Sequence, residues 1–162
     1  MKTLYLIRHA KSSWQDILLE DFDRPLNKRG RTDAPFMAKK LRKLGIMPDI
    51  IISSPAKRTK ETAKFLVEEI GYKKDVVFDK GIYESNISTL NKIIKAIDDK
   101  NDSSFLIGHN PTLNIFVENY VEMYDNIPTL GIIVIEFDCD KWEDISTQNG
   151  SLKSFMYPKK YK

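Results

Sequence analysis

The sequence contains a single cysteine, Cys139, among 162 residues, which excludes a disulfide framework and a zinc site built on cysteines. No apolar run approaches the roughly 20 residues of a membrane-spanning helix, and the N-terminal run Leu4–Ile7 is too short for a signal peptide. Glycine and proline, with 7 residues each, are too few for a collagen-like or low-complexity chain. Neither sign of charge dominates, because 26 basic and 23 acidic residues leave a net charge of +3. We therefore expect a cytoplasmic protein with neither a membrane nor a nucleic acid as its partner.

The composition that remains is typical of a globular protein. Hydrophobic residues make up 41% of the chain and charged residues 30%. A chain of this length buries roughly 70% of the surface that its unfolded form exposes, so a sizeable core is available without crosslinks. The length favours one domain that spans residues 1–162.

Short apolar runs alternate along the chain with longer segments of helical periodicity. The predicted strands are residues 3–7, 49–52, 76–78, 104–107, 132–137 and 152–156, and the predicted helices are residues 32–44, 55–70, 88–97 and 111–124. The first helix is placed near Thr32 because Pro35 is tolerated only in a first turn. This order predicts an α/β fold: a three-layer sandwich with a mainly parallel, doubly wound sheet and helices on both faces. The last two strands are expected to pair antiparallel at one side of the sheet.

Nitrogen-rich side chains follow three of the predicted strands, at the point where each strand ends. Arg8 and His9 end the first strand, Arg58 lies just after the second, and His109 follows the fourth. Because the carboxyl ends of parallel strands lie at one edge of a sheet, where ligands bind, we expect these four side chains to converge.

The turns after the second and fourth strands have similar sequences. Ser54 and Asn110 are expected to be the N-caps of the helices that follow, and Pro55 and Pro111 to be the first helical residues.

Each of these residues also has an ordinary structural interpretation. A histidine at a strand end is more often a satisfied polar residue than a catalyst, and Arg58 lies in a helix rich in exposed lysines. Arg58 nevertheless lies in the first turn of its helix, where the helix dipole disfavours a cation. A bound anion would explain a cation at that position. Both histidines of the chain also lie at the predicted edge, so the pattern favours a phosphate site.

These residue types suit phosphoryl transfer. Arginine guanidinium groups bind phosphoryl oxygens through two parallel hydrogen bonds. A neutral imidazole can attack phosphorus and carry the group covalently, and nearby positive charge helps to keep the ring unprotonated. A second histidine can donate to the equatorial oxygens in the transition state. The protein supplies the cations itself, so the pattern predicts neither a metal nor another cofactor.

Three segments resemble motifs of the histidine phosphatase superfamily. They are Arg8-His9-Ala10, the Ser-Ser-Pro-x-x-Arg-x-x-x-Thr pattern of residues 53–62, and Gly108-His109-Asn110. The length and the segment Asp23–Asn27 make the chain most similar to the short SixA-type phosphohistidine phosphatases. The resemblance implies that His9 is the nucleophile and becomes phosphohistidine, and that Arg8, Arg58 and His109 form the phosphate pocket.

The resemblance also suggests further site residues. Gln15 and Arg24 fall where family members have side chains near the phosphate, and Asn110 belongs with them as a substrate-binding residue. Glu84 follows the third strand, where family members place a general acid. The alternative interpretation of Glu84 is an ordinary solvated glutamate in a loop. The acidic stretch Glu20–Asp23 is interpreted as a solvated entrance loop.

Three functions stay open at this point. The first is a metal-independent phosphatase acting on protein phosphohistidine and releasing inorganic phosphate, which fits the absence of a segment long enough to form a lid over the site. The second is a small-molecule phosphomonoesterase or mutase-like enzyme, and the third is a non-catalytic phosphate-binding adaptor.

Overall fold

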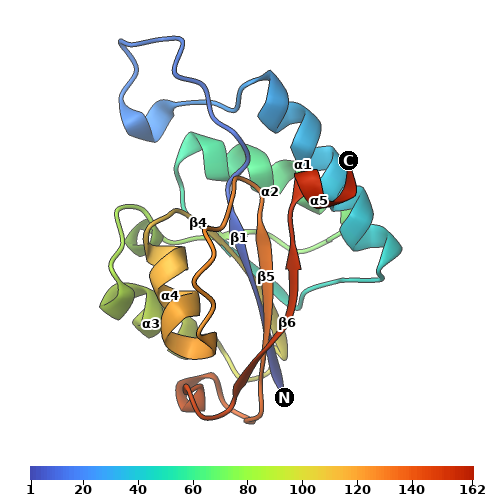
Figure 1. Ribbon diagram of the computed structural model, residues 1–162, viewed down its shortest axis with the longest axis vertical. Coiled ribbons are helices and arrows are strands. Elements are labelled where there is room, and N and C mark those ends of the chain that lie inside the picture. Colours follow the sequence, from blue (N-terminus) through green and yellow to red (C-terminus); the bar gives the residue numbers. More distant parts are fainter.

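The computed structural model describes residues 1–162 and contains one six-stranded sheet in the order β3-β2-β4-β1-β5-β6 (Figure 1). The strands are β1 (Lys2–Arg8), β2 (Ile50–Ser53), β3 (Val77–Phe78), β4 (Ser103–Gly108), β5 (Ile132–Phe137) and β6 (Gly150–Met156). Strands β1 to β4 pair parallel, whereas β5 pairs antiparallel with β1 and with β6. The predicted mainly parallel sheet with an antiparallel side is confirmed, and the strand that reverses direction, β5, lies one position in from the edge.

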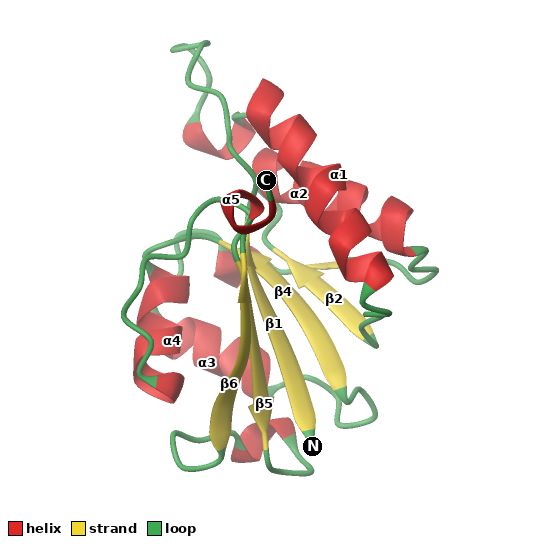
Figure 2. Cartoon of the chain, turned by 45° about the vertical axis from the view of Figure 1, so that its right-hand side comes forward, coloured by secondary structure: helices red, strands yellow, loops and turns green.

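Helices cover both faces of the sheet (Figure 2). They are α1 (Lys28–Lys43), α2 (Lys57–Ile70), α3 (Ile87–Lys95), α4 (Thr112–Val121) and α5 (Pro158–Tyr161), with three short 3-10 helices, η1 (Asp21–Asp23), η2 (Lys80–Ile82) and η3 (Trp142–Asp144). None of the helices combines the length and apolar character that crossing a bilayer requires.

Alternation along the central strands produces two cores, one on each face of the sheet. In β1, Leu4 and Leu6 join the cluster beneath α3 and α4, whereas Ile7 joins the cluster beneath α1 and α2. Leu106 and Ile107 of β4 divide between the clusters in the same way. Strands β1 and β4 therefore contribute side chains to the cores on both faces of the sheet.

The predicted start of the first helix is wrong. Helix α1 begins at Lys28, not near Thr32, and Pro35 lies inside it. Asn27 caps this start, since its Oδ1 accepts a hydrogen bond from Gly30 N at 2.9 Å. The cap, together with the buried face of α1, outweighs the loss of one hydrogen bond at proline.

The predicted caps of α2 and α4 are also wrong. Helix α2 starts at Lys57 without a side-chain cap, and α4 starts at Thr112. Ser54 Oγ lies 2.8 Å from His109 Nε2, and Asn110 Nδ2 donates to the Ile127 carbonyl at 2.9 Å. Both side chains therefore serve the turns that follow the strands instead of the helix starts.

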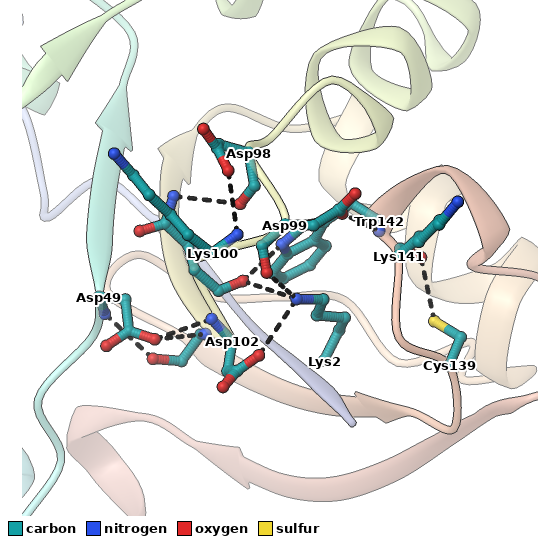
Figure 3. A network of polar contacts seen from close by, with 11 residues as sticks. Lys2, Asp49, Asp98, Asp99, Lys100, Asp102, Cys139, Lys141 and Trp142 are labelled. Atoms are coloured by element: carbon teal, nitrogen blue, oxygen red, sulfur yellow. Dashed lines mark hydrogen bonds and ion pairs between the residues drawn. The ribbon is translucent and has the colours of Figure 1, made fainter.

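A buried lysine fixes the opposite end of the sheet (Figure 3). Lys2 is 1% exposed, and its Nζ donates to the carbonyls of Asp99 (2.6 Å) and Asn101 (3.1 Å) and to Asp102 Oδ1 (3.1 Å). Trp142 Nε1 donates to the same Asn101 carbonyl at 2.7 Å. An ammonium group has three donors, and all three are satisfied here.

We expect Lys2→Met to lower the free energy of unfolding by about 2–3 kcal/mol, because the hydrogen bonds of a buried charged donor are lost. Urea denaturation measures this change. Lys153→Met is the matched control, since Lys153 forms an exposed ion pair with Glu136 at 3.6 Å and should contribute less than about 1 kcal/mol. Equal losses in the two variants would contradict the structural role assigned to Lys2.

Candidate functional site

The turns after β1, β2 and β4 bring four predicted residues to one cavity of about 220 Å³. Its lining consists of Arg8, His9, Lys11, Ser12, Trp14, Asp21, Arg24, Arg58, His109, Asn110 and Thr129. The register pairs Arg8 with Gly108, so the residues that follow them, His9 and His109, lie side by side with ring centroids 5.3 Å apart. The parallel pairing of β1 with β4 thus places the two histidines together, although they are far apart in the chain.

The hydrogen bond of His9 determines which of its ring nitrogens carries the proton. His9 Nδ1 lies 2.7 Å from the Ala10 carbonyl oxygen. A carbonyl can only accept, so Nδ1 carries the proton and donates it. In the neutral ring, Nε2 then holds a free electron pair. Such a nitrogen is a nucleophile.

His109 is held by Ser54. Its Nε2 lies 2.8 Å from Ser54 Oγ, and the same oxygen accepts a hydrogen bond from Ala56 N at 3.2 Å, which leaves the Ser54 hydroxyl proton free for Nε2. The other ring nitrogen of His109, Nδ1, is buried and has no partner. Three more buried polar atoms at the cavity have none: Arg8 Nε, Arg58 Nε and Asn110 Oδ1. Buried polar groups are normally paired, so this concentration of unpaired ones suits an anionic ligand, since two of the four are arginine donors.

Two arginines provide most of the positive charge at the histidines. Arg8 ends β1 and donates from Nη1 to the Ile127 carbonyl at 3.0 Å. Arg58, 6% exposed in the first turn of α2, donates from Nη1 to the Asp21 carbonyl (2.8 Å) and from Nη2 to Asp21 Oδ2 (3.0 Å). Because desolvation and the neighbouring Arg58 both disfavour its charge, the pKa of Arg8 lies below its usual value.

Burial and these charges keep both histidines neutral near pH 7. Burial is the main cause that lowers the pKa of His9 to about 3, and His109, Arg58 and Arg8 act in the same direction against the hydrogen bond to Ala10. Burial and then the charge of Arg58 lower the pKa of His109 to about 4. A neutral, nucleophilic Nε2 on His9 is therefore available over the whole physiological pH range.

A close backbone contact supports the segment that follows His9. A Cβ added at Gly30 in α1 would lie 2.2 Å from the Lys11 carbonyl oxygen. The same carbonyl accepts from Asn27 N at 3.0 Å. Glycine thus allows α1 to approach the chain where Lys11 and Ser12 line the cavity.

Comparison with known proteins identifies the family. The family described as the Histidine phosphatase superfamily (branch 1) matches residues 4–112, more than half of the chain. This chain belongs to the histidine phosphatase superfamily. The match covers the three motifs at His9, Arg58 and His109.

Solved structures of this family resemble the chain over nearly its whole length. A protein described as the phosphohistidine phosphatase SixA of Agrobacterium tumefaciens is 27% identical, with a TM-score of 0.83, over 97% of this chain and 98% of that one. The structure of SixA complexed with tungstate superposes with a TM-score of 0.85 at 18% identity, covering 99% of each chain. The second likeness concerns the fold alone.

Relatives compared by sequence are more varied. An uncharacterized protein of Mycobacterium leprae is 26% identical over 94% of this chain and 100% of its own. An uncharacterized chloroplastic protein of Arabidopsis thaliana is 48% identical over 43% of this chain and only 32% of its own length. Escherichia coli proteins named as probable phosphoglycerate mutase GpmB are 33% identical over 57% of this chain and 42% of their own. The family and the SixA neighbours support a phosphatase.

Not every residue suggested by the histidine phosphatase resemblance lies at the cavity. Arg24 and Asn110 line it. Gln15 is exposed and borders a neighbouring hollow together with Lys11 and Arg31. Glu84 is exposed, has a left-handed backbone with a φ of 53°, and is not among the residues that line the cavity.

The interpretation of residues 20–23 as a merely solvated entrance loop misses one residue. Asp21 in η1 lines the cavity and contacts Arg58, as described above, and Arg24 Nε at 3.2 Å. Tyr83, next to Glu84, donates its hydroxyl to Asp21 Oδ2 at 2.7 Å. The partners Arg58 and Tyr83 lie 37 and 62 positions further along the chain, so local sequence carries no signal for these contacts. No group of three or more His, Cys, Asp or Glu residues is placed to share a metal ion.

The lowered pKa values of the two histidines predict a loss of stability in acid. In the unfolded chain both histidines titrate near pH 6.5, so the unfolded state binds protons below that pH. The folded state binds them only near pH 4 at His109 and near pH 3 at His9. The free energy of unfolding is therefore highest above pH 6.5 and falls as the pH drops toward those values.

We expect each histidine to lower the free energy of unfolding by about 2 kcal/mol between pH 8 and pH 5. Urea denaturation of the wild type and His109→Gln at both pH values measures the share of His109. The variant should lose about 2 kcal/mol less than the wild type over this interval. Equal losses of the free energy of unfolding in the wild type and in His109→Gln would show that His109 titrates normally in the folded protein.

Proposed function

We propose that this protein is a phosphatase that moves the phosphoryl group of a protein phosphohistidine onto His9 and then onto water. The strongest support is the hydrogen bond from His9 Nδ1 to the Ala10 carbonyl, which leaves a free electron pair on Nε2. In the first step that pair attacks phosphorus, and the P–N bond of the substrate breaks with its electrons returning to the leaving imidazole. In the second step a water oxygen attacks phosphorus, the bond between phosphorus and His9 Nε2 breaks with its electrons returning to Nε2, and inorganic phosphate leaves neutral His9. The water's surplus proton goes to solvent.

The other residues around the cavity would stabilise the transferring group. Arg8 and Arg58 supply planar guanidinium groups for its oxygens, each with a buried Nε that has no protein partner. Ser54 can donate its hydroxyl to His109 Nε2, which would leave the proton on His109 Nδ1 and make this nitrogen a donor to the phosphoryl group. A chain with both histidines and both arginines around one cavity is better suited to catalysis than to passive phosphate binding.

The size of the cavity favours a phosphoryl group carried by a macromolecule. Its volume of about 220 Å³ lies below the roughly 300–1,000 Å³ of pockets that enclose small-molecule ligands. Beside it the chain between His9 and η1 protrudes from the body of the molecule (Figure 1). This segment exposes apolar side chains, with Ile17 and Leu18 each 90% exposed and Trp14, which lines the cavity, 69% exposed. A protein surface delivering a phosphoryl group would contact Ile17 and Leu18, which do not line the cavity, and a small ester inside the cavity would not.

We expect the double substitution of Ile17→Ser and Leu18→Ser to lower kcat/KM for a phosphohistidine protein about 10-fold relative to that for p-nitrophenyl phosphate. Loss of two apolar contacts of ordinary size accounts for a change of this order. Steady-state kinetics on both substrates measures the ratio. Tyr124→Ser is the matched control, because Tyr124 is 73% exposed and is not among the cavity residues. An unchanged ratio in the double variant would argue against a protein substrate.

A small-molecule phosphomonoesterase or mutase-like enzyme is the second candidate, favoured by the likeness to proteins named as phosphoglycerate mutase. An alkoxide leaving group needs a general acid, and Glu84 would have to move into the cavity to supply it. If this candidate is correct, Glu84→Gln slows hydrolysis of an alkyl phosphate about 10²-fold or more, and the wild type prefers that ester to the phosphohistidine protein.

We further propose that residues 1–162 act as one domain and that the protein works in the cytoplasm. Its partner would be the phosphorylated protein, and inorganic phosphate its product. The single cysteine supports a reducing compartment.

A further inference from the structure

Asp21 is the one carboxylate among the residues that line the cavity. Its two oxygens are used unequally. Oδ2 accepts from Arg58 Nη2 at 3.0 Å and from the Tyr83 hydroxyl at 2.7 Å, whereas Oδ1 accepts only from Arg24 Nε at 3.2 Å. A carboxylate offers about four acceptor positions, so one position on Oδ1 stays open. The side chain is 49% exposed, which leaves that position accessible to a ligand.

Asp21 is ionised under ordinary conditions. Burial alone would raise the pKa of this carboxyl group, but the hydrogen bond from Tyr83 and the charge of Arg58 outweigh it and hold the pKa below its usual value. Asp21 therefore acts as a hydrogen-bond acceptor and is not a source of protons.

An acceptor at this place distinguishes between the two classes of phosphoryl donor. A phosphate ester has no N–H near its phosphorus, and its negative charge is repelled by a carboxylate. Phosphohistidine carries the phosphoryl group on one ring nitrogen and, when protonated, an N–H on the other. A ring that keeps this proton leaves as neutral imidazole when the P–N bond breaks, and no external acid is needed.

We propose that Asp21 is a specificity-determining residue that accepts a hydrogen bond from the unphosphorylated ring nitrogen of the substrate's phosphohistidine. The inference rests on the proposed function. As His9 Nε2 forms its bond to phosphorus, the electrons of the breaking P–N bond return to the phosphorylated nitrogen, and the proton on the other nitrogen stays there, held toward Oδ1. The leaving group then departs neutral, which explains how the reaction can proceed with Glu84 outside the cavity.

Phosphoimidazole and p-nitrophenyl phosphate test this proposal, because only the first presents a ring N–H. Asp21→Asn should lower kcat/KM for phosphoimidazole about 10- to 100-fold, the loss expected for a hydrogen bond between charged partners. The same substitution should raise kcat/KM for p-nitrophenyl phosphate, because Arg58 loses a competing carboxylate. Asp23→Asn, which changes an exposed aspartate of the same 3-10 helix that does not line the cavity, is the matched control and should alter both values less than twofold.

Opposite changes on the two substrates support the proposal. A rise of kcat/KM for both substrates would show that Asp21 only competes for Arg58, and a fall for both would show a structural role. Either result overturns the proposal. Asp21→Ser must reproduce the opposite changes, and thermal denaturation checks that both variants fold. If the wild type hydrolyses both substrates but the variants do not change the two kcat/KM values in opposite directions, the role of Asp21 is wrong and the proposed function stands. If the wild type hydrolyses neither, the proposed function itself is wrong.

Discussion

His9→Ala is expected to lower kcat by at least about 10⁴-fold on both a phosphohistidine protein and an aryl phosphate. Loss of a covalent nucleophile has effects of this size in other enzymes, and no other cavity residue presents a nitrogen electron pair fixed as His9 Nε2 is by the Ala10 carbonyl. The arginines would still bind the phosphoryl group, so KM should change much less than kcat. Steady-state kinetics with a sensitive phosphate assay measures both.

His9→Asn is the companion variant, since its amide can keep a hydrogen bond to the Ala10 carbonyl but cannot attack phosphorus. Both variants should stay folded, which circular dichroism verifies. If either variant keeps more than about one hundredth of the wild-type kcat, His9 is not the nucleophile.

Arg58→Lys is expected to lower kcat/KM by about 30- to 1,000-fold, equivalent to about 2–4 kcal/mol of transition-state stabilisation. Arg58 already makes paired hydrogen bonds from Nη1 and Nη2 to Asp21, and its Nε is unpaired. A planar fork of this kind can contact two phosphoryl oxygens at once, whereas a lysine ammonium cannot reproduce that geometry. The inhibition constant of tungstate, an oxyanion, should rise in parallel.

Arg42→Lys is the control for this experiment. Arg42 lies on α1 in a surface ion pair with Glu69 at 2.9 Å, with 55% of its side chain exposed, and its replacement should change kcat/KM less than twofold. Near-normal rates in Arg58→Lys would show that the buried guanidinium is not used on the phosphoryl group.

The sequence predicts the central strands β1 and β4 well because each contains a continuous apolar run. Strands buried on both faces, such as β1 and β4, carry this pattern clearly. The expected meeting of Arg8, His9, Arg58 and His109 follows from one topological rule, that parallel strands end at the same edge. The structure brings these residues to one cavity.

Other features depend on contacts that local rules do not describe. Pro35 argues locally against a helix that begins at Lys28, but the Asn27 cap and the buried face of α1 are stronger. Ser54 and Asn110 match the preferences of N-caps, yet each finds a partner on another element, His109 for the first and Ile127 for the second. A propensity that describes one helix end cannot include such partners.

The positions of the acidic residues also depend on contacts that local sequence does not predict. Glu84 occupies the expected position after β3, but its side chain is exposed, while the adjacent Tyr83 reaches Asp21. Hydrogen bonds from Arg58 and Tyr83, which are distant in sequence, hold Asp21 at the cavity. Only the folded arrangement shows which carboxylate lines the cavity.

The most direct test of the account is to locate the phosphoryl group during turnover. The enzyme is mixed with a phosphohistidine protein, quenched in base, digested and analysed by tandem mass spectrometry at neutral to basic pH. We predict a base-stable, acid-labile phosphoryl group on His9 in the wild type and none in His9→Asn. A phosphoryl group on Ser53 or Ser54, or turnover without any covalent intermediate under conditions that preserve phosphohistidine, would contradict the account.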